Sequence, residues 1–356
     1  MEFIENVDVK SCKWLVDQIK EDGDFLSTCV VAGEFDQYKK TGVLKTLFNL
    51  IKSGGSTKTK YVKKDSSGIL RDYGGGVQSL PSKIRGLICQ HMTDVDMQNC
   101  QPSILNNLCK KHDISANYLN EYVTNRDKIF EKYGKTIKQE VIRSMNKSTH
   151  IKAVGWLESF DKEMKRIQKE LVVLPEYQVH LDMAKQKPGN VNGRFMAYLA
   201  TSYEVKILHE VITAPKVQIG VLMFDGFMFY GEPPENYLTY LSELVKTNLG
   251  MDIVWTYKEH DKTLQVPEDY NPSVEKDPET IFTDMAEEFE KNHCLIREEG
   301  IYVRHGLNKT SMLSHKQLTD SYRHMVCGYR KTMGGDMPIN FIKKWADNNP
   351  SIRMYR

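Results

Sequence analysis

Two short segments place carboxylates where they could bind a divalent cation. In residues 91–97 (HMTDVDM) the alternation of a strand puts Asp94 and Asp96 on one face. In residues 221–230 two apolar runs meet at Asp225, in an Asp-Gly dipeptide typical of a two-residue hairpin turn. Acids on one face repel unless a cation lies between them or one is protonated. Two acids on separate elements are therefore candidate ligands for Mg²⁺, or for Mn²⁺ in its place, in phosphoryl transfer.

Each segment also has a simpler interpretation. Asp94 and Asp96 would face water if their strand lay at a sheet edge. Aspartate is also a preferred turn residue, so Asp225 could occupy the turn without any role in catalysis. The residues after Asp96 favour a site, because Pro102 suits a first helical turn and an apolar stripe follows it. The acids of the first segment would then end a strand just before a helix.

The segment between the two acids offers a cation. Residues 135–146 (KTIKQEVIRSMN) predict an amphipathic helix with apolar residues at every fourth position. Lys138 and Asn146 are eight residues apart and project to roughly the same side of that helix. A lysine there could neutralise an incoming triphosphate. The simpler interpretation is a solvated surface lysine.

The rest of the pattern predicts an α+β fold. Helical spacing fills the first 50 residues and most of residues 103–175, and strand signals lie at 217–230 and 251–257. Residues 60–70 predict a hairpin. Prolines after Val266 predict a linker, and a helical, charged C-terminal piece follows it.

Composition limits the class of protein. The 356 residues are 40% apolar and 27% charged with a net charge of +2, which allows a substantial core. The charge is uneven, because residues 37–64 hold eight lysines and no acid. This stretch could follow a phosphate backbone or form a solvated surface.

No stretch of 18 apolar residues and no signal peptide occurs, which predicts an intracellular protein that is neither secreted nor membrane-spanning. The seven cysteines have no CxxC spacing and predict reduced thiols. Four further residues match no zinc-ligand spacing: His293, Cys294, His305 and His315.

The order of the motifs resembles DNA polymerase family A, the bacterial polymerase I-like enzymes with a palm domain. Residues 77–85 (VQSLPSKIR) resemble the LQNIP…IR stretch that precedes motif A in that family. DMQNCQ, from Asp96 to Gln101, matches the register of its DYSQIE motif A, so Asp96 falls on the catalytic aspartate and Gln101 on the glutamate sugar gate.

Motifs B and C follow in the same order. Lys138 and Asn146 fall on the lysine and tyrosine of motif B, and FDG at residues 224–226 falls on the His-Asp-Glu of motif C. The resemblance runs from about residue 60 to residue 260. The joint order and spacing of these short motifs carries it.

A closer resemblance is to the transposon and viral branch of these polymerases, found in virophages and giant DNA viruses. There the first segment reads much like DVDMQNCQPSIL, and motif C reads FDG. In that branch the palm is often followed by a linker and a superfamily 3 helicase. The ending FIKKWADNNPSIRMYR resembles the start of such a region, which makes that helicase, in the same polypeptide or complex, an expected partner. The expected location is a viral or host replication site.

The resemblance implies a right-hand polymerase: a palm with an antiparallel sheet, helical fingers, a reduced N-terminal thumb and a helical C-terminal connector. The implied divisions are residues 1–58 as the thumb-like region, 59–105 as palm with motif A, 106–190 as fingers with motif B, 191–265 as palm with motif C, and 266–356 as a helical linker toward the helicase region.

The resemblance also implies roles for individual residues. Asp96, Asp225 and Lys138 would be catalytic, and Asp94 would assist the two metal-binding aspartates. The expected contacts with nucleoside triphosphate are Arg85, Asn99, Gln101, Lys135, Lys138 and Asn146. The expected contacts with primer–template or single-stranded DNA are Lys60, Lys63, Arg71, Gln78, Asn192 and Arg194.

The sequence departs from the family at several positions. Gly134 stands where the family has the motif B arginine, for which Lys135 or Arg126 could substitute, and Gly226 stands where it has the second carboxylate of motif C. Gln101 and Asn146 replace the residues that normally help to select deoxyribose, which leaves the sugar preference open.

Three functions are compatible with these residues. The leading hypothesis is a template-directed nucleotidyltransferase, a DNA polymerase with or without primase activity. The alternative is a catalytically silent nucleic-acid-binding module that loads a replicative helicase, which the departures in motif B favour. A metal-dependent nuclease would use the acids but gives no use for Lys138.

Overall fold

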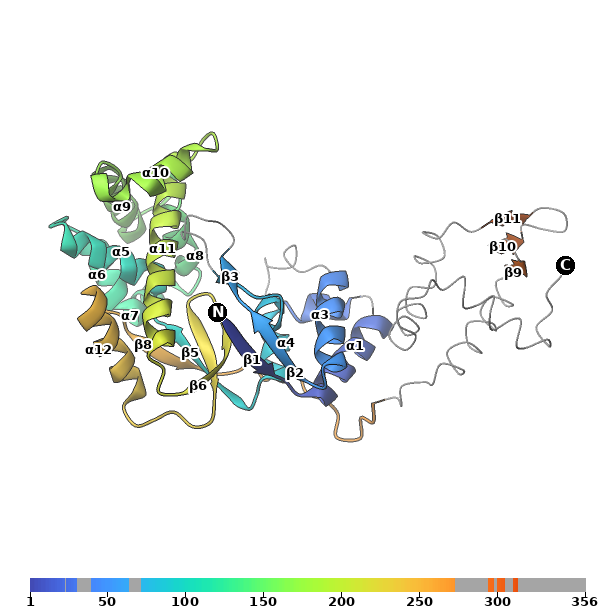
Figure 1. The fold of residues 1–356 in the computed structure, drawn as a ribbon. Coiled ribbons are helices and arrows are strands. Elements are labelled where there is room, and N and C mark those ends of the chain that lie inside the picture. Colours follow the sequence, from blue (N-terminus) through green and yellow to red (C-terminus); the bar gives the residue numbers. More distant parts are fainter. Residues whose placement is uncertain are drawn as a thin grey trace. The chain divides into compact units, whose positions relative to one another are not determined.

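The computed structural model describes residues 1–22, 24–30, 40–63 and 72–272, together with three strands between residues 294 and 312. It divides into two compact units, residues 1–270 and residues 271–356. The first unit combines antiparallel sheets with many helices (Figure 1), which confirms the predicted α+β class. None of the described helices combines the length and apolar composition that a bilayer crossing needs.

A four-stranded antiparallel sheet lies at the centre of the first unit. Its strand order is β6-β7-β5-β8. The bounds are Met92–Met97 for β5, Gln218–Leu222 for β6, Gly226–Tyr230 for β7 and Trp255–Lys258 for β8. The strands predicted near residue 95 and at 217–230 are confirmed, and β8 begins four residues later than the pattern indicated.

The side chains of β5 and β7 separate onto two faces because a strand has a period of two. Val95 pairs with Phe227, and both belong to a large core shared with the central helices. On the other face Met92 and Met228 join a second core, which is built with the N-terminal helices. Asp94 pairs in register with Met228 and follows Met92 by two residues, so the acidic face is the one that the N-terminal helices partly cover.

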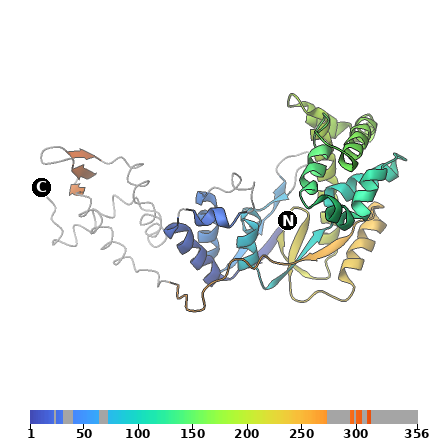
Figure 2. The same cartoon turned by 180° about the vertical axis from the view of Figure 1, so that it is seen from behind.

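Helices α5 to α12 gather on one side of the sheet (Figures 1 and 2). On the other side lie α1 (Val9–Glu21), α3 (Lys40–Lys52) and α4 (Ser82–Ile88). The helical stretch predicted from residue 103 onward is confirmed. Its bounds are Cys100–Lys111 (α5), Asn117–Thr124 (α6), Arg126–Tyr133 (α7), Ile137–Met145 (α8), Trp156–Val172 (α9), Gln178–Lys185 (α10), Val191–Thr213 (α11) and Tyr237–Leu249 (α12).

The N-terminal region is not wholly helical, as residues 1–58 were expected to be. It opens with strand β1 (Glu2–Asn6), which pairs with β2 (Ser56–Lys60). The helices lie between them: α1 (Val9–Glu21), α2 (Phe25–Thr28) and α3 (Lys40–Lys52). The strand pattern is weak because Glu5, a charged residue, occupies the buried position of β1.

Glu5 joins three segments that are far apart in the sequence. Its carboxylate accepts a hydrogen bond from Tyr61 Oη at 2.5 Å and another from Val77 N at 2.9 Å. Burial raises the pKa of Glu5, although these bonds oppose the shift. Tyr61 Oη in turn accepts from Leu222 N at 3.2 Å, which connects the N-terminal sheet to the end of β6.

Strand β1 is also bonded directly to the central sheet. The Tyr230 hydroxyl accepts from Asn6 N at 2.7 Å and donates to Ile4 O at 2.8 Å. The first residues of the chain are therefore bonded to the last residue of β7.

A short antiparallel pair lies near the predicted 60–70 hairpin, whose second half falls outside the described residues. β3 (Val62–Lys63) pairs with β4 (Asp72–Tyr73), and residues 64–71 between them lie outside the described part. Arg71, an expected DNA contact, falls in that gap.

In the C-terminal unit the described residues are strands, whereas the expectation was a helical linker. Its described residues form a three-stranded antiparallel sheet of β9 (Cys294–Arg297), β10 (Gly300–Arg304) and β11 (Thr310–Met312). Neighbouring β-branched and aromatic residues, as in GIYVR, favour strands over helices. The rest of residues 273–356, His293, His305 and His315 included, lies outside the described part.

The hairpin that carries Asp225 is confirmed, but its turn lies one residue earlier than Asp-Gly predicts. Met223 N donates to Gly226 O at 2.9 Å, so Phe224 and Asp225 lie in the turn and Gly226 begins β7. Neither Asp225 nor Gly226 has a positive φ. Glycine is needed here for another reason, since a Cβ on Gly226 would lie 2.0 Å from the carbonyl oxygen of Val95 on β5.

We expect Gly226→Ala to lower the free energy of unfolding by roughly 1–3 kcal/mol, because the new methyl group must push β7 away from β5. Urea denaturation followed by circular dichroism measures this change.

Gly42→Ala is the matched control. Gly42 lies inside α3 with nothing within 4 Å of the added Cβ, so this variant should gain about 0.5–1 kcal/mol from helix propensity. Equal stability of the two variants would contradict the close contact between β5 and β7.

Candidate functional site

The antiparallel pairing of β5 and β7 brings the two predicted acids together. Asp96 is paired in register with Gly226, and Met97 N donates to the carbonyl oxygen of Asp225 at 2.9 Å. The carboxyl groups of Asp96 and Asp225 are close enough to form a hydrogen bond. The side chain of Asp96 is 24% exposed, so the pair is shielded but can be reached from solvent.

The proximity of two acids changes their ionisation. Burial and the neighbouring charge of Asp225 raise the pKa of Asp96 to about 8, while Lys258 opposes the shift. Lys258 Nζ lies 3.7 Å from Asp96 Oδ2 and projects from β8. Two carboxyls and one ammonium therefore meet near the C-terminal end of β5. There the acids repel each other unless a proton or a cation lies between them.

Asp94 lies on the same face of β5, two residues before Asp96. Burial raises its pKa, against the favourable charges of Lys258, His260 and Arg85. A cavity of about 750 Å³ borders Asp94. It is lined in part by Thr93, Asp94, Lys258, His260, Lys262 and Gln265.

The expected nucleotide contacts near motif A lie beside the acids in sequence. Arg85, on α4, donates from Nη1 to the carbonyl of Leu80 and places its charge near Asp94. Asn99 is the N-cap of α5 and adopts a left-handed backbone conformation with φ of 50°. Its side chain makes no capping hydrogen bond, and its Nδ2 atom is buried without a partner among the described residues. Gln101 is half-buried in the first turn of α5.

The expected motif B residues lie on a different helix. Lys138 is exposed on α8, Lys135 is exposed just before that helix, and Asn146 caps its C-terminal end. Helix α8 packs against α7, α9 and α11. The motif B cation is therefore carried by the helical part of the molecule and the acid pair by the sheet.

Two of the expected DNA contacts make hydrogen bonds to the backbone inside the protein. Gln78 is only 2% exposed and accepts a hydrogen bond from Gly74 N at 2.9 Å. Arg194 donates to the carbonyl of Ala184 at 3.0 and 2.9 Å and to that of Pro188 at 3.3 Å, so its guanidinium fastens the start of α11 to the end of α10. Both side chains satisfy backbone groups that would otherwise be unpaired.

For the remaining expected DNA contacts the structure gives a position in the fold and, for two of them, the exposure of the side chain. Lys60 is exposed on β2, and Asn192 is half-buried in the first turn of α11. Lys63 ends β3, and only its backbone is described.

Sequence reasoning missed Lys258. Its signal was present but weak, because Lys258 is one of several lysines near the end of the 251–257 strand pattern. Only the register Asp94–Lys258 and Asp96–Thr256 places it against the acids.

Comparison with known proteins gives one distant relative. A Sputnik virophage protein named as a helicase is 26% identical over 226 aligned residues, which cover 54% of this chain and 28% of that protein. The chain thus spans little more than a quarter of the length of the relative. No family model and no solved structure matches the chain.

The residues present fit a divalent cation. Mg²⁺ is commonly bound through one or two carboxylates, with water and substrate phosphates completing its shell. Asp96 and Asp225 supply two such groups, and their mutual repulsion is relieved by a cation between them. A group of three metal-binding side chains is not found within the described ranges, so a metal here would depend on the substrate for further ligands.

The raised pKa of Asp96 predicts how stability changes with pH in the presence of a chelator. Between the ordinary aspartate pKa of 3.8 and about 8 the folded protein holds a proton that the unfolded chain has lost. The free energy of unfolding should therefore decrease as pH rises through this range. Urea unfolding with EDTA at pH 5 and pH 8 measures the decrease.

The comparison variant is Asp96→Asn, which resembles the protonated acid at every pH. It should lose less stability than the wild type between the two pH values. An equal loss in both proteins would show that Asp96 titrates normally and that the acids do not meet.

Proposed function

We propose that this chain is the polymerase part of a viral or mobile-element replication protein and catalyses template-directed nucleotidyl transfer. The observation that carries the proposal is the meeting of Asp96 and Asp225, which are 129 positions apart in the sequence. Two carboxylates from separate strands are the minimal protein contribution to a two-metal phosphoryl-transfer site.

The fold supports this function in two further respects. An antiparallel sheet that carries the acids suits a palm, and helices α5 to α10 that carry Lys138 suit fingers. The virophage relative is named as a helicase and is far longer than this chain, which supports a replication context and a helicase region as partner. DNA and nucleoside triphosphates are the proposed substrates, and the choice between dNTP and NTP stays open.

The proposed reaction forms one phosphodiester bond and breaks one phosphoanhydride bond. The primer 3′-oxygen attacks the α-phosphorus of the nucleotide, its proton passes to solvent, and pyrophosphate leaves in line. Asp96 and Asp225 would hold Mg²⁺, which when bound supplies charge neutralisation at the reacting phosphate. Lys138 would pair with the triphosphate as negative charge moves to the leaving group.

Lys258 has a defined part in this scheme. Its ammonium lies 3.7 Å from Asp96 and offsets the repulsion within the acid pair. Its side chain is 55% exposed and can swing away without leaving a buried charge unpaired.

We expect Asp96→Ala and Asp225→Ala each to reduce primer extension by at least about 10³-fold, because either change leaves one carboxylate to bind the metal. Extension of a labelled primer on a DNA template with Mg²⁺, using dNTPs and NTPs separately, measures the rate. EDTA should abolish extension by the wild type.

Asp252→Asn is the matched control, because Asp252 is an exposed acid that pairs with Lys246. It should extend primers at the wild-type rate. Undiminished extension by either alanine variant would contradict the proposed site. Salt-sensitive DNA binding without nucleotide incorporation by the wild type would instead favour a silent module that loads a helicase, and cleavage without synthesis would favour a nuclease.

A further inference from the structure

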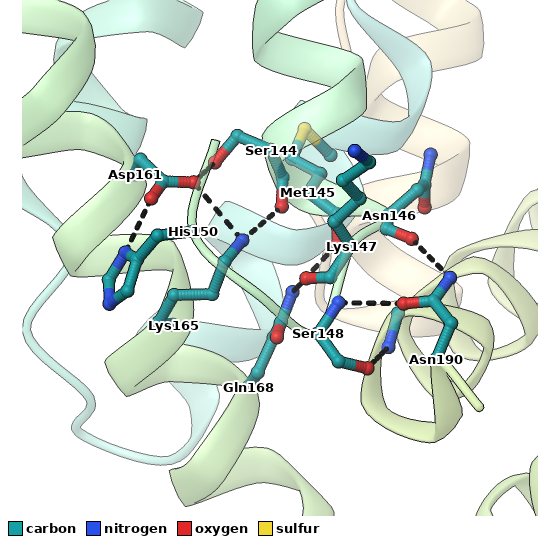
Figure 3. Close-up of polar contacts among 11 residues, drawn as sticks. Ser144, Met145, Asn146, Lys147, Ser148, His150, Asp161, Lys165, Gln168 and Asn190 are labelled. Atoms are coloured by element: carbon teal, nitrogen blue, oxygen red, sulfur yellow. Dashed lines mark hydrogen bonds and ion pairs between the residues drawn. The ribbon is translucent and has the colours of Figure 1, made fainter. Parts of the chain in front are cut away.

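The C-terminal end of α8 is fastened by polar side chains from two other helices (Figure 3). Lys165 Nζ, on α9, donates to the carbonyl of Ser144 at 2.6 Å. Gln168 Nε2, one turn later, donates to the carbonyls of Met145 at 3.0 Å and Lys147 at 2.9 Å. These carbonyls belong to the last helical turn and the residues after it, where the regular hydrogen bonds of the helix end. The Ser144 carbonyl also accepts from Lys147 N at 3.5 Å, so the ammonium of Lys165 adds a stronger donor to it.

The loop after α8 is held from the opposite side by the start of α11. Asn190 Nδ2 donates to the carbonyl of Asn146 at 2.9 Å, and Asn190 Oδ1 accepts from Ser148 N at 2.7 Å. Gly193 N donates to Ser148 Oγ at 3.1 Å. A Cβ on Gly193 would lie 2.2 Å from the Asn146 carbonyl, so α11 and the loop are in direct contact.

The polar side chains of α9 in this network are buried, and two of them carry charges whose burial is costly. Lys165 is 6% exposed, Asp161 2% and Gln168 1%. Asp161 Oδ1 lies 3.1 Å from Lys165 Nζ and accepts from Ser144 Oγ at 2.6 Å, and Asp161 Oδ2 lies 2.6 Å from His150 Nδ1. Burial lowers the pKa of Lys165, and the hydrogen bond to Asp161 opposes that shift.

The side chains that face away from this network are those of Asn146 and Lys147. All the bonds drawn to these two residues in Figure 3 end on their backbone carbonyl oxygens. A loop whose backbone is fixed from two sides, and whose side chains take no part in that fixing, is typical of a preorganised binding element.

We propose that Lys165 and Gln168 are positioning residues that fix the end of α8 so that Asn146 can contact the incoming nucleotide. The inference rests on the proposed function, since it assigns the nucleotide to this helix. It gives a role to Lys165 and Gln168, two residues of α9 that lie outside the polymerase motifs. The ammonium of Lys165 acts at the negative end of the α8 dipole, where a cation is stabilising.

Direct binding of a fluorescently labelled dATP with Mg²⁺, without DNA, tests the proposal. Lys165→Met removes the charge and keeps the length of the side chain, and it should weaken binding by about tenfold or more, as small displacements of binding groups do. Lys169→Met is the matched control, because Lys169 is exposed one turn further along the same helix. It should bind dATP like the wild type.

A double-mutant cycle separates positioning from general destabilisation. Asn146→Ala combined with Lys165→Met should bind dATP no more weakly than Asn146→Ala alone, because both changes act on the same contact between Asn146 and the nucleotide. Asp161→Leu with Lys165→Met removes the buried pair together and should recover thermal stability relative to the single variant. Its dATP affinity should stay low, because the Ser144 carbonyl has still lost the ammonium of Lys165.

The outcomes distinguish this inference from the proposed function. Wild-type affinity in Lys165→Met, or recovery of affinity together with stability in the double variant, would overturn the positioning role. Failure of the wild type to bind dATP would also overturn it. A third outcome is that the wild type binds dATP and Lys165→Met weakens that binding as expected, yet the wild type extends no primer. That outcome would refute the polymerase proposal and leave the positioning role standing.

Discussion

The approach of β7 to the backbone of β5 is the constraint on which the acidic site depends. At Gly226 the two strands are so close that a single methyl group would overlap the Val95 carbonyl. This contact lets the hairpin turn reach the end of β5, and Met97 N then bonds to the carbonyl of Asp225. The carboxyl of Asp225 meets that of Asp96 because the backbones are already in contact. Repulsion between the acids is thus imposed by strand packing, and the fold supplies the free energy that opposes it.

Much of this arrangement could be predicted from local pattern. The alternation in HMTDVDM separates Asp94 and Asp96 from Val95 and Met97, and burial in the structure follows it. The two apolar runs around Asp225 predicted the hairpin. Gly226, however, serves a close contact with another strand, and its φ is not positive. A dipeptide pattern contains no information about a neighbour 130 residues away.

The features that could not be predicted are those fixed by distant partners. Glu5 reads as a surface acid, yet it is fully buried because Tyr61 and Val77 bond its carboxylate. Gln78 and Arg194 read as DNA contacts, and both bond backbone groups instead. Lys165 looked like any lysine of a charged helix. In each case the side chain is polar and the pattern correctly indicates polarity, but the partner that decides its position comes from tertiary structure.

The bonds between Tyr230 and strand β1 have a consequence for the order in which the protein is assembled. Asn6 and Tyr230 are 224 residues apart, so a nascent chain leaving the ribosome cannot close this edge until β7 has emerged. At common translation speeds of about 5–20 residues per second, that interval is of the order of ten seconds or more. During it β1 can pair only with β2, whose residues leave the ribosome long before those of β7. Completion of the acidic hairpin and capture of the amino-terminal strand are therefore one late event in biosynthesis.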